Sequence, residues 1–165
     1  MRTGMHADIA LRFAIEDLYA DYAQALDEGA ITRWPGFFAD PCLYRLVSKE
    51  NHDKGLPLSL MLCNSQGMLR DRALACQEFN VYAPRTWRHV ITQIRVRDAA
   101  EPMPDSITVR ANFTILETLQ DQHTTILCAG RYRDQLVWVD GVLRFREKIC
   151  IYDTNLIPGT VVFPV

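Results

Sequence analysis

Four side chains of this sequence have the chemistry of an acid–base site: Glu147, His89, Asp71 and Tyr44. Glu147 lies in phase with the apolar residues of the run 142–153, so we expect its carboxyl group on the apolar face of a strand. Desolvation on such a face favours the neutral carboxyl group, which suits a general acid or base. His89 shares a strand face with apolar neighbours, and Asp71 and Tyr44 could reach the same cavity if the sheet curves around it.

A structural interpretation of the same residues remains open and is favoured. In it, Glu147 pairs with an arginine across the sheet, and His89 is a hydrogen-bonded histidine of the core or of an interface. Arginines recur at expected strand positions, namely Arg85, Arg88, Arg131, Arg133, Arg144 and Arg146. They indicate either an anion site or a sheet face that is exposed to solvent or packed on a partner subunit. Guanidinium groups bind the carboxylates of a partner subunit well.

The sequence contains no recognisable metal-binding or phosphate-binding motif. Its four histidines, His6, His52, His89 and His123, include no pair three to five residues apart. The Cys/His spacing of a Rieske cluster and a two-histidine-one-carboxylate pattern are both absent. Glycine-rich phosphate loops and the Gly-x-Ser-x-Gly nucleophile elbow are absent as well. We therefore expect no metal-binding and no cofactor-binding residues, and no catalytic residues unless the four candidates form a site.

Composition and charge narrow the class of protein. The chain has 165 residues, of which 48% are hydrophobic and 23% charged, as is typical of one soluble domain. Its formal net charge of −2 lacks the basic excess of a nucleic-acid-binding protein. No apolar run is long enough to span a membrane, and no secretory signal is evident, so we expect a cytoplasmic protein. The 5 cysteines, without a C-x-x-C pair, are expected to fill the core.

Hydrophobic periodicity predicts the elements that position these residues. Helical spacing predicts helices over 8–27, 32–38 and 66–80, with Asp8 and Ser65 as N-caps and Gly29 after the first helix. Alternation with a period of two predicts strands over 42–48, 86–98, 106–119, 123–138 and 142–153. The dipeptide Asp140-Gly141 predicts a hairpin turn between the last two strands.

This order of elements predicts an α+β fold in a single domain, 1–165, with N-terminal helices packed on a curved antiparallel sheet. A sheet that curls around the long first helix would form a cone with a pocket at its mouth. The apolar ending, residues 161–165, is expected to dock either on the chain's own core or on another subunit.

Several segments, in this order and spacing, resemble one family over nearly the whole chain. They are LYADYAQALDEGAITRWPGFFADPCLYRL, KENHDKGLPL, SQGMLRDRALA, the Arg-x-x-Arg-His run at 85–89, and KICIYDTNLIPGTVVFPV. The family is the small (β) subunit of the terminal oxygenase of Rieske-type aromatic-ring-hydroxylating dioxygenases. The loop at 49–58 and the Ile-Pro ending look most like the branch acting on aromatic carboxylates, such as salicylate, anthranilate and terephthalate.

The resemblance implies the cone-like fold of nuclear transport factor 2, scytalone dehydratase and ketosteroid isomerase. It also implies a trimer of small subunits within an α3β3 hexamer, in aromatic compound catabolism. The Rieske 2Fe-2S cluster and the mononuclear iron would lie in the partner large (α) subunit, and this chain would be structural. The alternatives are a free-standing dehydratase or isomerase that uses Glu147, His89, Asp71 and Tyr44, and a non-catalytic module that binds a small molecule.

Overall fold

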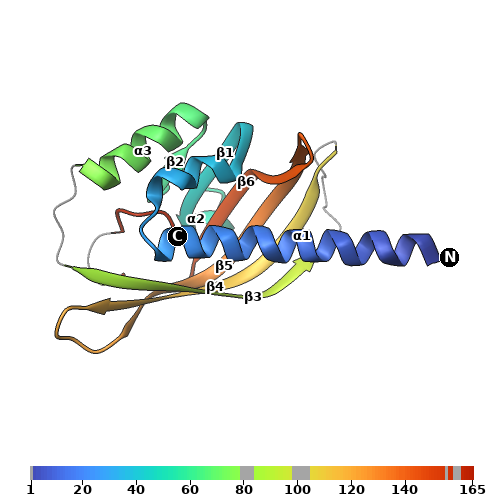
Figure 1. The fold of residues 1–165 in the computed structure, drawn as a ribbon. Coiled ribbons are helices and arrows are strands. Elements are labelled where there is room, and N and C mark those ends of the chain that lie inside the picture. Colours follow the sequence, from blue (N-terminus) through green and yellow to red (C-terminus); the bar gives the residue numbers. More distant parts are fainter. Residues whose placement is uncertain (1, 79–83, 98–104, 155, 158–160) are drawn as a thin grey trace.

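The structure is a computed structural model, and it describes residues 2–78, 84–97, 105–154, 156–157 and 161–165. Helices and strands follow one another in the expected order, with the helices mostly in the first half (Figure 1). The elements are α1 (Arg2–Asp27), the 3-10 helix η1 (Ile31–Phe37), β1 (Phe38–Ser48), α2 (Lys49–Asp53), β2 (Met61–Cys63), α3 (Gln66–Glu78), β3 (Arg85–Val96), β4 (Ile107–Leu119), β5 (Thr125–Val139) and β6 (Val142–Tyr152). Within the described residues, no helix has the length and apolar character needed to cross a membrane.

The six strands form one curved sheet in the order β2-β1-β6-β5-β4-β3, and α1 runs across one face of it (Figure 1). This arrangement confirms the expected α+β class. The expectation of a purely antiparallel sheet is wrong in one place, because β1 pairs with β6 in parallel. A tight hairpin can join only antiparallel strands, whereas β1 and β6 are far apart in the sequence and can therefore pair in parallel.

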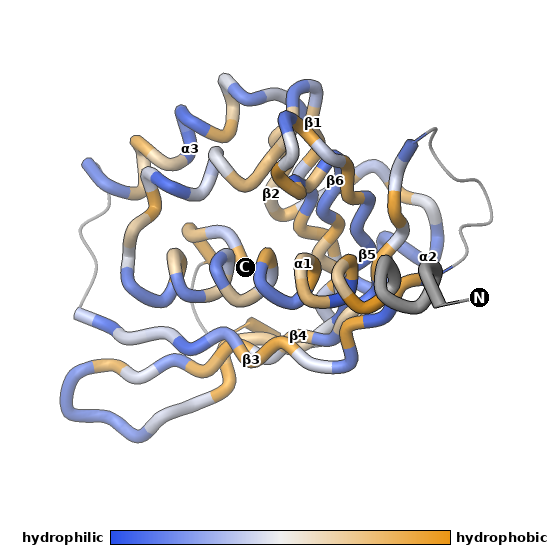
Figure 2. Tube along the Cα trace, turned by 45° about the vertical axis from the view of Figure 1, so that its right-hand side comes forward, coloured by the Kyte–Doolittle hydropathy of each residue, from blue (hydrophilic) through white to orange (hydrophobic). Residues whose placement is uncertain are grey.

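α1 buries one face against the sheet, as its periodicity predicts. Its buried positions include Ile15, Leu18, Tyr22 and Leu26, and Figure 2 shows hydrophobic and hydrophilic residues alternating along the helix. The helix begins at Arg2, so the expectation that Asp8 caps it is wrong, because helical backbone continues on both sides of that residue. The expected stop is confirmed: Gly29 follows the helix with a φ of 71°, which glycine adopts without strain.

The shorter elements differ from the expectations at their ends. The expected second helix is the 3-10 helix η1, and β1 begins at Phe38, four residues earlier than expected. The expected loop at 49–57 contains α2, which is capped by a hydrogen bond from the Asn51 N–H to the Ser48 side chain. Ser65 caps α3 as expected, accepting from the Met68 N–H at 3.3 Å. The expected ends of the third helix at 80 and of the strand at 98 lie outside the described residues.

A β-bulge at Arg146 changes which residues of β6 face the core. Gln135 pairs with Glu147 and Leu136 pairs with Phe145, so Arg146 has no partner of its own on β5. The alternation shifts by one residue at such a bulge. Lys148, rather than Glu147, therefore shares the inner face with Phe145, and the expectation that Glu147 lies on the apolar face is wrong.

The described part of the C-terminal segment, residues 161–165, packs on the chain's own core. Val165 is buried, its N–H donates to the Tyr44 hydroxyl at 2.9 Å, and the Tyr22 hydroxyl donates to its main-chain oxygen at 2.8 Å. Phe163 lies edge-on to Trp87, with ring centroids 4.7 Å apart. Of the two docking surfaces expected for this segment, the chain's own core is the one observed.

Candidate functional site

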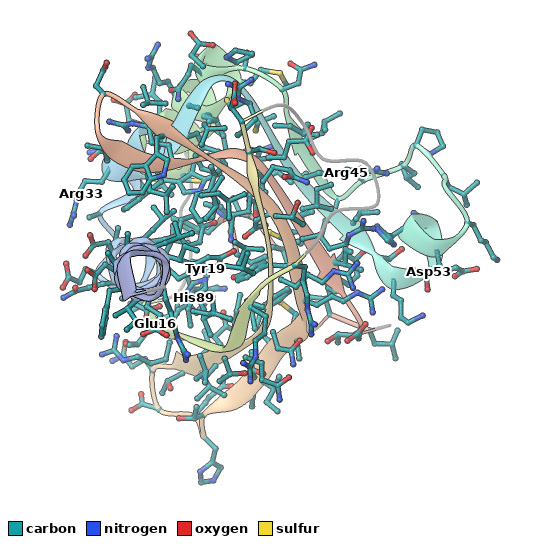
Figure 3. All side chains as sticks on the ribbon, turned by 90° about the vertical axis from the view of Figure 1, so that its right-hand side faces the viewer. Glu16, Tyr19, Arg33, Arg45, Asp53 and His89 are labelled. Atoms are coloured by element: carbon teal, nitrogen blue, oxygen red, sulfur yellow. The ribbon has the colours of Figure 1, made fainter. Side chains whose placement is uncertain are left out.

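A buried ion pair lies at the centre of the fold, between the sheet and α1. Lys148 Nζ is 3.0 Å from Asp134 Oδ2, and both side chains are fully buried. The two residues are cross-strand neighbours on β6 and β5. The Tyr19 hydroxyl, reaching in from α1 (Figure 3), donates to the same Asp134 oxygen. A lysine ammonium and a carboxylate thus neutralise each other where neither could remain charged alone.

Aromatic rings surround the ammonium group of Lys148. Its Nζ lies 3.5 Å from the centroid of the Tyr132 ring, and the rings of Tyr19, Tyr22 and Phe145 lie within 4.8 Å. Ring faces attract a cation, so this environment stabilises the charged lysine. Burial raises the pKa of Asp134, an effect that Lys148 and Tyr19 oppose. Burial also raises the pKa of Tyr19 well above 10.0, and the Asp134 carboxylate adds to that effect.

His89 and Asp27 form a second pair of side chains, which connects β3 to the end of α1. His89 Nδ1 lies 2.6 Å from Asp27 Oδ1, and the His89 main-chain N–H donates to the same carboxylate at 3.0 Å. Because a carboxylate only accepts, Nδ1 donates its proton and Nε2 faces away from Asp27. Nε2 is buried and has no hydrogen-bond partner within the ranges that the structure describes. A histidine held in this way has the form of a general base that a substrate could meet.

Residues 161–165 occupy the space beside His89. The cavity that remains there has a volume of about 10 Å³ and is lined by Trp87, His89, Ile115, Leu127 and residues 161–165. A single water needs a cavity of about this volume, so an organic substrate does not fit. At the rim, the buried Glu117 accepts from Arg85 at 2.9 Å and from the Trp87 indole at 3.0 Å. Glu117 thus makes the carboxylate–arginine pairing across the sheet that the sequence suggested for Glu147.

The four candidate residues do not converge on one site. Tyr44 is fully buried and binds the main chain of Val165, so Tyr44 and His89 both border the segment 161–165. Glu147 lies on the outer face of the sheet, opposite Leu43 and Gln135. Asp71 is exposed on α3, a helix that packs on η1, β1 and β2.

Sequence reasoning missed Lys148, Asp134 and Asp27. The signal for the first two was present in the hairpin around Asp140-Gly141. Continued without a bulge, the hairpin register would place Glu147 opposite Asp134. Two acids in that position repel each other, whereas a one-residue shift brings Lys148 opposite Asp134.

The described residues contain no group of three or more His, Cys, Asp or Glu side chains that could hold a metal ion. All 5 cysteines are free and buried. Cys128 and Cys150 have pKa values raised to about 12 by burial. The donor set of this part of the chain therefore does not fit an iron or a Rieske cluster, whose ligands are cysteine and histidine side chains grouped in space.

Comparison with known proteins was made on the sequence and on the fold. Residues 7–148 match the model of the SnoaL-like domain. The anthranilate 1,2-dioxygenase small subunit of Burkholderia cepacia is 31% identical over 158 residues, covering 96% of each chain. A crystal structure from Novosphingobium aromaticivorans, assigned to the beta subunit of an aromatic-ring-hydroxylating dioxygenase, is 35% identical. It superposes with a TM-score of 0.82 over 94% of this chain and 96% of that one.

The fold is also shared with a solved structure of much lower sequence identity. A structure from Novosphingobium aromaticivorans, described as a scytalone dehydratase, has a TM-score of 0.68 at 18% identity, over 91% of this chain and 89% of that one. At this identity the likeness concerns the fold alone. It agrees with the expected cone-like architecture.

Proposed function

Because this chain belongs to the SnoaL-like family and, within it, to the small subunits of aromatic-ring-hydroxylating dioxygenases, we propose that it is a structural subunit of such an oxygenase. The observation that carries the proposal is full-length similarity to a dioxygenase small subunit. The interior of the fold agrees with it, since residues 161–165 fill the space beside His89. In this role the chain contributes a rigid, folded surface to the enzyme and makes no contact with the reacting atoms.

We propose aromatic carboxylates as the substrate class of the assembled enzyme, in aromatic compound catabolism. The relative from Burkholderia cepacia is named for anthranilate, an aromatic carboxylate. In this proposal the substrate pocket lies in the large subunit, so this chain influences substrate choice only through assembly.

The redox groups are proposed to lie in the large subunit. A Rieske 2Fe-2S cluster would supply electrons there, and a mononuclear iron would activate oxygen. The described residues of this chain offer no fitting ligand group, and we derive no step through either group. The chain, as one domain over 1–165, is proposed to act in the cytoplasm.

For the assembly we propose a trimer of small subunits in an α3β3 hexamer with three large subunits. Obligate subunit contacts commonly bury more than about 2,000 Å². Exposed large apolar side chains that such contacts would cover include Phe13, Leu58, Val96, Ile126 and Trp138.

A second candidate function rests on the His89–Asp27 pair. A free-standing dehydratase or isomerase of this fold would use Nε2 of His89 as its base. That activity requires residues 161–165 to leave the cavity that they fill in the structure.

Co-expression with the large subunit of an aromatic-ring-hydroxylating dioxygenase whose small subunit resembles this chain tests the proposal. A tag on this chain should retain the large subunit through purification, and the complex should hydroxylate anthranilate or a related aromatic carboxylate. This chain alone should turn over no substrate. A chain that never binds the large subunit, or that dehydrates or isomerises a substrate alone, would contradict the proposal.

A further inference from the structure

Three arginines lie side by side across three strands on the outer face of the sheet. Arg95 on β3 pairs in register with Arg110 on β4, and Arg110 pairs with Arg133 on β5. All three are exposed, on the face opposite to the buried residues of β4. We call these three residues the arginine ladder. Like charges directly opposite one another in a sheet repel and lower stability, so the ladder costs the isolated fold free energy.

No carboxylate within the described part of the chain forms an ion pair with the ladder. The Arg133 guanidinium lies 3.2 Å from Nε2 of His52, which is a ring nitrogen and not an acid. The nearby Arg131 reaches Asp53 at 3.5 Å. Beside the ladder is a surface hollow of about 320 Å³, lined by Gln93, Arg95, Arg97, Arg110, Ala111, Asn112 and Arg131. This face therefore offers several guanidinium and amide donors to an anionic partner.

An acidic counterpart lies on the exposed face of α1. Asp17 and Asp21 are exposed there, and Glu28 is exposed in the turn that directly follows the helix; we call these three residues the acidic stripe. None of the three makes an ion pair with a described residue, and the contact of Glu28 is with the Gln24 amide at 2.9 Å. Asp17 and Asp21 also line a groove of about 590 Å³ between α1, η1 and the β5–β6 hairpin.

The arginine ladder and the acidic stripe have similar spacings between their charged residues, and they lie on different sides of the molecule. Asp17 and Asp21 are one helical turn apart, about 6 Å along the axis, and neighbouring strands of the ladder are about 4.8 Å apart. α1 covers the inner face of the sheet, whereas Asp53, which contacts Arg131, lies on the far side (Figure 3). One chain therefore cannot neutralise its own ladder with its own stripe, but two copies can.

We propose that the arginine ladder of one copy binds the acidic stripe of a second copy, head to tail. Two different complementary surfaces on each copy produce a heterologous contact, which closes into a ring when the rotation between copies allows it. The inference rests on the proposed function, because it assigns residues to the trimer of small subunits proposed above. The ladder spans three strands, so it fits a row of carboxylates better than one small anion.

Charge exchange tests the contact on the full-length chain. One variant is Arg110→Glu/Arg133→Glu, a second is Asp17→Lys/Asp21→Lys, and a third combines all four substitutions. Light scattering after size-exclusion chromatography gives the mass of each. The wild-type chain should be a trimer, each double variant a monomer, and the fourfold variant a trimer again, because its charges are complementary once more. The control Arg70→Glu/Asp71→Lys exchanges two exposed charges on α3 and should leave the trimer intact.

Circular dichroism confirms that each variant is folded before its mass is interpreted. A wild-type chain that stays monomeric, or double variants that keep the trimer mass, would overturn the inference. It is also overturned if the ladder variant remains a trimer but no longer binds the large subunit, since the ladder then belongs to that interface. A trimer that follows the charge pattern yet never binds a large subunit sustains the inference and contradicts the proposed function instead.

Discussion

Lys148 and Asp134 face each other across β6 and β5 with Nζ 3.0 Å from Oδ2, and neither side chain has any exposed surface. Tyr19 binds the same carboxylate from α1, so the pair joins the first helix to the last two strands. The pair and the aromatic rings around the Lys148 ammonium group fill the space between α1 and the sheet.

Removal of one partner of this pair should destabilise the fold strongly. Lys148→Met leaves Asp134 buried without its cation, which costs about 3–5 kcal/mol in the free energy of unfolding. The double variant Lys148→Met/Asp134→Leu should recover most of this loss, because no charge is then left unpaired. Urea unfolding of Lys148→Met, Asp134→Leu and the double variant measures the coupling energy between the two side chains. Single variants that unfold like the wild type would contradict this account of the core.

Gly130 is required by the close approach of β5 to β6. A Cβ atom there would collide with the Ile151 carbonyl oxygen and lie 2.8 Å from the Tyr152 Cα. Gly130→Ala should therefore lower the free energy of unfolding by about 3 kcal/mol, since backbone atoms must move apart. Gly67→Ala is the matched control in α3, where the new Cβ atom would lie 3.8 Å from the Ser65 hydroxyl oxygen. That change should stabilise by about 0.5–1 kcal/mol, and equal effects at both positions would argue against this explanation.

Phe163 packs edge-on against Trp87 and lines the small cavity beside His89. Phe163→Ala should lower the free energy of unfolding by about 2 kcal/mol, less than for a fully buried phenylalanine, because this ring is only partly buried. The change should also alter the fluorescence of Trp87. Phe13→Ala, which truncates a phenylalanine that is 61% exposed, is the control and should leave stability nearly unchanged. Equal stability losses in the two variants would mean that Phe163 does not hold the segment 161–165 in place.

The buried thiols should be unreactive in the folded protein. Burial raises the pKa of Cys128 and of Cys150 to about 12, so neither forms the reactive thiolate near pH 8. Because the folded pKa lies above the unfolded value of 9.0, these thiols make stability fall as pH rises from 9.0 toward 12. A thiol reagent at pH 8 should count 5 groups in urea and almost none without it. Rapid labelling of the native chain would contradict the observed burial.

Most of the fold could be predicted from the sequence because its signals are local. The α1 periodicity, the Ser65 cap and the Asp140-Gly141 turn each depend on neighbouring residues, and each is confirmed. The parallel pairing of β1 with β6 depends on contacts between distant segments, which no local pattern records. The bulge at Arg146 is also a tertiary effect, since it brings Lys148 to Asp134.

The candidate site was predicted less well, for the same reason. Two-residue alternation placed Glu147 inside, and one bulged residue exchanged it for Lys148. His89 was identified from its strand face, but its partner Asp27 lies 62 residues earlier, at the end of α1. Asp71 could act as an acid or base, but it lies on the exposed face of α3. Its spacing in the sequence does not show whether it faces a pocket or solvent.

The turnover of the assembled oxygenase with an altered small subunit tests most directly whether this chain is structural. The large subunit is assembled with wild-type, His89→Gln or Asp27→Asn small subunit, and kcat is measured per mononuclear iron at matched hexamer content. The account predicts that kcat per iron stays the same in all three complexes, since His89 and Asp27 only join β3 to α1. Removal of a general acid or base lowers the rate by at least about 100-fold. A loss of that size in a fully assembled complex would therefore contradict the structural role of this chain.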